Sequence, residues 1–183
     1  MLGLTLTEDR QAASHWASSL LKCDDWVILD TETTGLDDAE ICQIAVIDSQ
    51  GKEKLNTLVK PSIAIPPNAI AIHGITDEIV RSAPTFADTH PLIQSAIQNS
   101  RVVIYNATFD IRILRLCCNL YQLPQFRYRE IICAMRWYAQ WYGDWNEYYK
   151  NYRWQPLEGG DHTALGDCLA TLQAIQEMAS FES

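Results

Sequence analysis

Four carboxylates and one histidine lie along the chain at positions where they could bind metal ions and transfer protons. Asp30 follows the uniformly apolar run 26–29, which is typical of a central strand, and Glu32 comes two residues later. Because residues i and i+2 of a strand project from one face, these two carboxylates point the same way. Adjacent carboxylates repel each other, and a divalent cation bound between them removes that repulsion. Taken alone, however, an Asp-x-Glu pair at a strand end is more often two solvated charges in a loop than a metal site.

The other three residues lie at the starts of two expected helices. Asp110 falls in the first turn of a helix expected over 108–120, where the helix dipole stabilises a carboxylate without any ligand. His162 and Asp167 are five residues apart, which on an ideal helix separates them by about 140°. They can share a site only if His162 lies at the frayed start of the last helix or in the loop before it. A lone histidine at such a place is otherwise a capping or surface residue.

Together these motifs resemble the DEDDh, or DnaQ-like, family of 3′–5′ exonucleases, which includes polymerase proofreading subunits and ribonuclease T. The matching segments span most of the chain: Asp30-Thr31-Glu32-Thr33-Thr34-Gly35, His73-Gly74-Ile75-Thr76, Asn106 with Phe109-Asp110, and His162 with Ala164 and Asp167. The resemblance implies a ribonuclease-H-like fold and the removal of nucleoside monophosphates from the 3′ end of single-stranded nucleic acid.

Hard oxygen ligands without a cysteine cluster favour two divalent cations, Mg²⁺ or Mn²⁺. The resemblance implies that Asp30 bridges both ions and that Glu32 and Asp167 complete one site. It further implies that Asp110 holds the second ion through water and that His162 is the general base. It also implies a set of residues that bind the terminal nucleotide: Thr33, Thr34, Gly35, Leu36, His73, Asn106 and Phe109.

A five-stranded mixed sheet has to bring these residues together. The expected strands are 26–29, 41–48, 52–59, 101–105 and 130–133. The expected helices are 5–22, 85–99, 108–120 and 162–178, with Leu165, Leu169, Leu172 and Ile175 facing the core in the last one. Three antiparallel strands, followed by two strands that alternate with helices, predict an α/β fold with helices on both faces. We expect one exonuclease domain over 1–183, with a lead-in helix in 1–24 and a catalytic core in 25–180.

The charge is unevenly distributed. The chain has a net charge of −9, yet residues 101–153 carry a net +4 and contain all eight tyrosines, so the remainder carries −13. A basic, aromatic stretch suits binding of a single strand, whereas the acidic remainder disfavours tight binding to long duplexes. We expect single-stranded 3′ ends as the partner, with DNA slightly favoured over RNA. In the segment 135–154, Trp137, Trp141 and Trp145 recur at helical spacing. They predict either a base-stacking wall or, with greater weight, a packing stripe or subunit interface.

Other features bound the class of protein. No apolar run is long enough for a membrane span, no secretory signal is present, and six cysteines without a CxxC pair suit the reduced thiols of a cytoplasmic protein. The family resemblance adds a polymerase or repair complex to the expected partners, and the aromatic surplus leaves a homodimer open. The alternative functions are a catalytically weak domain that binds strand ends and a polymerase-associated interaction module. Neither alternative accounts for five intact catalytic positions.

Overall fold

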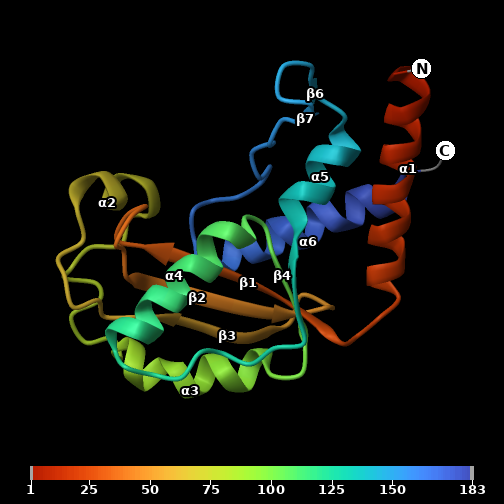
Figure 1. Ribbon diagram of the computed structural model, residues 1–183. Coiled ribbons are helices and arrows are strands. Elements are labelled where there is room, and N and C mark those ends of the chain that lie inside the picture. The colour runs from red at the N-terminus through yellow and green to blue at the C-terminus, as the bar shows by residue number, and fades with distance from the viewer. Residues whose placement is uncertain (1, 182–183) are drawn as a thin grey trace.

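A five-stranded mixed sheet lies at the centre of the protein (Figure 1). The computed structural model describes residues 2–181. The strands are β1 (Trp26–Thr33), β2 (Ile41–Asp48), β3 (Glu53–Leu58), β4 (Arg101–Ile104) and β5 (Glu130–Cys133). Their order is β3-β2-β1-β4-β5, with β1 antiparallel to β2 and parallel to β4. The predicted sheet is confirmed, and β1 is central and almost entirely buried because its apolar run faces helices on both sides.

Helices cover both faces of the sheet, as predicted (Figure 1). The helices are α1 (Leu2–Leu21), α2 (Pro67–His73), α3 (Phe86–Ile97), α4 (Ala107–Leu120), α5 (Ala134–Tyr142) and α6 (Ala164–Ser180). Residues of α1, α5 and α6 pack on one face around Ile28, and residues of α3 and α4 pack on the other around Val27 and Leu29. This alternation along β1 is the period of two expected for a strand between two layers.

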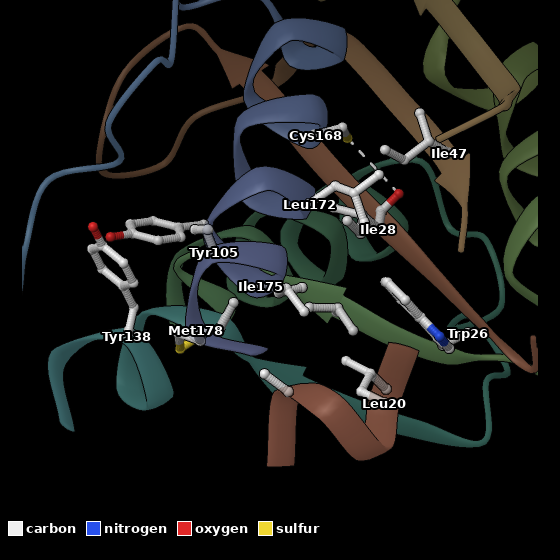
Figure 2. Close-up of a cluster of buried hydrophobic side chains, with 14 of the residues drawn as sticks. Leu20, Trp26, Ile28, Ile47, Tyr105, Tyr138, Cys168, Leu172, Ile175 and Met178 are labelled. Carbon is white, nitrogen blue, oxygen red and sulfur yellow. Dashed lines mark hydrogen bonds between the residues drawn. The ribbon is translucent and has the colours of Figure 1, made fainter. Parts of the chain in front are cut away.

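The lead-in helix α1 is part of the first of these two cores (Figure 2). Ala13, Ala17 and Leu20 are buried against α5 and α6. Trp16 stacks on Trp137 of α5, with ring centroids 4.9 Å apart and planes at 6°. The apolar stripe therefore attaches α1 to α5 and α6, and Trp137 belongs to a packing stripe, the more strongly weighted of the two alternatives.

Two details of the predicted helices are wrong. The helix with Trp137 ends at Tyr142 because Gly143, at φ 87°, takes the left-handed conformation that terminates helices. Trp145 therefore lies not on that helix but in β6 (Trp145–Asn146), which pairs with β7 (Asn151–Tyr152). In α6, Leu169 is 45% exposed, because the neighbouring Cys168 is the residue that faces the sheet. β1 continues four residues beyond its expected end at residue 29, and the other boundaries differ from the expected ones by no more than three residues.

The state of the thiols and the hydropathy of the helices agree with what the sequence predicts. All six cysteines are free; four are buried, Cys133 is half-buried and Cys23 is exposed. Within residues 2–181, no helix combines the length and the apolar character that crossing a membrane requires.

Candidate active site

Three of the predicted carboxylates converge where β1 meets the start of α6. Asp30 and Glu32 lie on the same face of β1 as Ile28, the face that α6 covers. Oxygen atoms of Asp30, Glu32 and Asp167 all lie within 4.8 Å of one another. Figure 2 shows Cys168 of α6 beside Ile28 of β1, with the Cys168 thiol 3.8 Å from the carbonyl oxygen of Ile28.

The fourth carboxylate reaches the same place from the other layer. Asp110 is in the first turn of α4 and is only 3% exposed. The Thr31 hydroxyl donates a hydrogen bond to Asp110 Oδ1 at 2.7 Å. Thr31 lies between Asp30 and Glu32, so the end of β1 carries two of the acids on one face and holds Asp110 through Thr31 on the other. Thr31 is a supporting residue that the sequence reasoning missed.

The pKa values record the concentration of negative charge. Burial, and then the charge of Asp110, raises the pKa of Asp30 well above its ordinary value. Burial, and then Asp167, raises the pKa of Glu32 to about 8. Burial also raises the pKa of Asp110 to about 7, although the Thr31 hydroxyl opposes the shift. Among the described residues, no lysine or arginine forms an ion pair with these four carboxylates. Their oxygen-only donor set fits hard divalent cations such as Mg²⁺ and Mn²⁺.

His162 lies in the loop before α6, the arrangement that the spacing to Asp167 required. The helix starts at Ala164, with Thr163 as its N-cap accepting from the backbone N–H of Gly166. Asp167 Oδ1 accepts hydrogen bonds from the backbone N–H groups of Asp161, at 3.0 Å, and His162, at 3.2 Å. One carboxylate thus fixes the loop that carries His162. The imidazole itself is exposed, and its residue has φ 59°, a left-handed conformation that costs about 1–3 kcal/mol.

Asp161 is a second supporting residue that the sequence reasoning missed. Asp161 Oδ1 accepts from the Thr163 backbone at 3.0 Å and from the Thr163 hydroxyl at 2.7 Å. It packs so closely on Gly166 that a Cβ atom there would lie 2.0 Å from this oxygen. The Asp-x-Thr spacing before a helix is a local turn signature that predicts such bonds.

The predicted nucleotide-binding turn after β1 is closed by its own side chains. The Thr33 hydroxyl donates to the carbonyl of Gly35 at 2.7 Å, and the Thr34 hydroxyl accepts from the backbone N–H of Glu40 at 3.0 Å. Both threonines are buried. Leu36, in contrast, is 74% exposed, and its carbonyl accepts a hydrogen bond from the Arg112 guanidinium. Of these four residues, Leu36 has the side chain that is most accessible to a ligand.

The remaining three predicted ligand residues lie at the end of α2 and at the start of α4. His73 Nδ1 accepts from the backbone N–H of Ile75, so Nε2 carries the proton and donates to the Thr33 carbonyl at 3.2 Å. Burial lowers the pKa of this half-buried imidazole, and its bonds join the end of α2 to β1. Asn106 is exposed at the start of α4 and does not cap it, while Phe109 is half-buried beneath the Arg112 guanidinium.

Comparisons with known proteins agree with this geometry. The family model RNase_T, described as an exonuclease, matches residues 27–175. The chain is 41% identical to the uncharacterized exonuclease CP81 of Escherichia phage 186, over 97% of each chain. It is 37% identical to the DNA polymerase III subunit epsilon of Buchnera aphidicola, over 46% of this chain but only 41% of that subunit.

A solved structure shows the same fold. Exonuclease X, determined in complex with 5′ overhanging duplex DNA, superposes with a TM-score of 0.60 and 29% sequence identity. The match covers 86% of this chain and 94% of that one. With the mixed five-stranded sheet and the four acids at one strand end, these matches establish the protein as a nuclease: the chain belongs to the DEDDh, or DnaQ-like, exonuclease family.

Proposed function

We propose that this nuclease is a two-metal-ion 3′–5′ exonuclease that releases nucleoside monophosphates from the 3′ end of single-stranded nucleic acid. The observation that carries the proposal is the convergence of Asp30, Glu32 and Asp167 within 4.8 Å, with Asp110 buried beside them. Burial, and then the neighbouring carboxylates, raise the pKa values of Asp30 and Glu32, so negative charge at this site is costly unless a cation is bound. Such a site is suited to binding cations.

The family resemblance implies the residue roles, and the oxygen-only donor set fits them. Asp30, Glu32 and Asp167 would hold one divalent ion, and Asp110, together with Asp30, would hold the second. When bound, two such ions stabilise the charge that develops on the attacking and leaving oxygens of a phosphodiester. Thr31 keeps the Asp110 carboxylate oriented through its 2.7 Å hydrogen bond.

His162 is the proposed general base. Its imidazole is exposed and is therefore open to the attacking water, and its backbone is fixed to Asp167 by a 3.2 Å hydrogen bond. An imidazole can accept a proton near neutral pH. The left-handed backbone at His162 is the kind of local strain that functional sites retain.

Residues around the turn after β1 would position the terminal nucleotide. Leu36 and Phe109 offer apolar contact to its base, and the exposed Asn106 offers hydrogen bonds. Thr33, Thr34, Gly35 and His73 would act by shaping this turn, because the side-chain bonds of the two threonines and the histidine are made within the protein.

DNA is the proposed substrate in preference to RNA, since exonuclease X was determined with DNA. A polymerase or repair complex, a homodimer and a cytoplasmic location remain predictions. The epsilon-subunit match supports the first of these, and the free thiols are compatible with the last.

A time course on 5′-labelled single-stranded DNA and RNA of the same sequence tests the function. With Mg²⁺ or Mn²⁺, we expect a ladder that shortens from the 3′ end, faster for DNA. Over the same time course we expect no visible shortening with chelator or in His162→Ala. A duplicate labelled at the 3′ end should release its label as a mononucleotide at once. Release of the 5′ label first, or no cleavage with either metal, would overturn the proposal.

A further inference from the structure

A groove of about 1150 Å³ runs along the open edge of the sheet and is lined from α4 and α5. Figure 1 shows where these two helices lie. All four residues of β5, the edge strand, line its floor. Its walls come from α4 on one side and from α5 with Trp16 of α1 on the other. The groove is therefore a feature of the fold's outer edge and is distinct from the carboxylate cluster.

The groove is basic in an acidic protein. Four arginines line it, Arg101, Arg112, Arg115 and Arg136, against a single acid, Glu130. Arg101 forms an ion pair with Asp25, but within residues 2–181 the other three arginines have no carboxylate in ion-pair contact. The chain has 23 acidic and only 14 basic residues, so acids are plentiful enough to pair with every arginine. The charge balance therefore does not explain why three guanidinium groups in one groove lack a carboxylate partner among the described residues. Unpaired guanidiniums are available to bind phosphate groups.

Aromatic surface accompanies this charge. Trp16 and Trp137 pack on each other, but both are only half-buried, so the stacked pair also lines one wall of the groove. Tyr128 contributes from the segment before β5. Aromatic faces bordered by cations are how proteins bind single strands without reading sequence, since every base has a face that can stack. The groove thus combines both components of such a site.

The groove also begins next to the proposed active site. Ala107 and Thr108, in the same first turn of α4 as Asp110, line one end of it. One turn later, Arg112 lines the groove and donates to the carbonyl of Leu36, in the turn proposed to hold the terminal nucleotide. From Ala107 to Asn119 the lining follows α4 for about 18 Å at 1.5 Å per residue.

We propose that this groove binds the single-stranded segment on the 5′ side of the terminal nucleotide, with Arg115 and Arg136 contacting its phosphates. The inference rests on the proposed function, which places a 3′ end at the carboxylates. At the roughly 3.4 Å rise of a stacked strand, about 18 Å accommodates about five nucleotides. Both arginines are exposed, so their replacement leaves the core intact.

Fluorescence anisotropy of single-stranded DNA oligomers of two to ten nucleotides tests the groove. The full chain is used in Mg²⁺ with His162→Ala as background, so that the probe stays intact. The test variant adds Arg115→Ala and Arg136→Ala. The matched control adds Lys52→Ala and Lys54→Ala, two exposed cations at or beside β3, the opposite edge of the sheet.

Affinity of the background protein should rise with length up to about five nucleotides and then level off. The arginine variant should bind the ten-nucleotide strand at least tenfold more weakly at low salt, with the two-nucleotide affinity changed less than twofold. The slope of log Kd plotted against log salt concentration should fall by about 1.4 in this variant, which is about 0.7 for each lost phosphate contact. The control variant with Lys52→Ala and Lys54→Ala should keep the salt slope of the background protein. A variant with Arg115→Lys and Arg136→Lys should keep it as well, because it retains both charges.

An unchanged slope, or equal weakening of the short and the long strand, would overturn the proposal. A strandless substrate separates this result from the proposed function. With His162 intact, the p-nitrophenyl ester of thymidine 5′-monophosphate should be hydrolysed equally by the wild type and the arginine variant. No hydrolysis by the wild type would count against the proposed function, whereas the binding measurement would still decide whether the groove holds a strand.

Discussion

Replacing Glu32 with Gln is expected to stabilise the protein in the presence of chelator. Glu32 is 9% exposed and lies within 4.8 Å of oxygens of both Asp30 and Asp167. Gln has nearly the same shape but no charge, so the substitution removes two repulsive pairs and the cost of burying one carboxylate. Most substitutions of a buried residue destabilise a fold, which makes a gain here diagnostic.

The magnitude follows from the distance. Two unit charges 4.8 Å apart repel by about 0.9 kcal/mol at the dielectric constant of water and by about 3.5 kcal/mol at an effective value of about 20. Because local relaxation relieves part of this repulsion, we expect a net gain in unfolding free energy of about 1–3 kcal/mol. For a chain of this length, that gain corresponds to a rise in Tm of about 2–12 °C.

The gain in stability from Glu32→Gln must grow as the pH rises. The pKa of Glu32 is raised from 4.5 in a model peptide to about 8 in the folded protein. Below pH 4.5 the group is protonated in both states and costs nothing. Between pH 4.5 and 8 the unfolded chain loses the proton first, so the penalty on the folded state grows, and above pH 8 it is complete. The gain from Glu32→Gln is therefore absent at pH 4 and largest at pH 9.

Differential scanning calorimetry in EDTA at pH 4, 7 and 9 measures this effect. Glu53→Gln, an exposed glutamate on the edge strand β3, is the matched control and should shift Tm by less than about 2 °C. A lower Tm for Glu32→Gln at pH 9, or a gain of the same size at every pH, would refute the reasoning about charge at this site.

Three further predictions concern the same site. Mg²⁺ at about 100 times its Kd should stabilise the wild type by about 2.7 kcal/mol, and calorimetry of Asp30→Asn should show most of this shift lost; an equal shift in the variant would place the ion elsewhere. His162→Ala should lower kcat/KM about 10²–10⁴-fold in the gel assay while Tm stays within about 2 °C, because the side chain is exposed; retention of activity would exclude His162 as the base. Gly166→Ala should lower kcat at least about tenfold, since its Cβ would lie 2.0 Å from Asp161 Oδ1 and displace the loop before α6; unchanged kcat would show that this loop's position is unimportant.

The parts of the site that depend on local geometry were predictable from sequence. The apolar run before Asp30 identified the central strand, and a period of two was enough to place Asp30 and Glu32 on one face. The spacing of His162 and Asp167 required a histidine outside the helix, and the structure has it there. Each of these inferences uses residues fewer than ten positions apart.

Long-range packing decided the rest. The Thr31–Asp110 hydrogen bond joins residues 79 positions apart, and no spacing rule connects β1 to α4. Helical periodicity suggested that Trp145 continues the stripe of Trp137, but Gly143 in a left-handed conformation ends the helix first. Similarly, Cys168 rather than Leu169 faces the sheet, because the close approach of α6 to β1 admits a small side chain at that point.

Anomalous diffraction from crystals grown with Mn²⁺ and a nucleoside 5′-monophosphate tests the central claim most directly. The account predicts two Mn²⁺ peaks, one ligated by Asp30, Glu32 and Asp167 and the other shared between Asp30 and Asp110, with the phosphate bound to both ions. In crystals of Asp30→Asn both peaks should be lost or weakened. Mn²⁺ bound only away from these carboxylates, with the nucleotide bound elsewhere, would contradict the account.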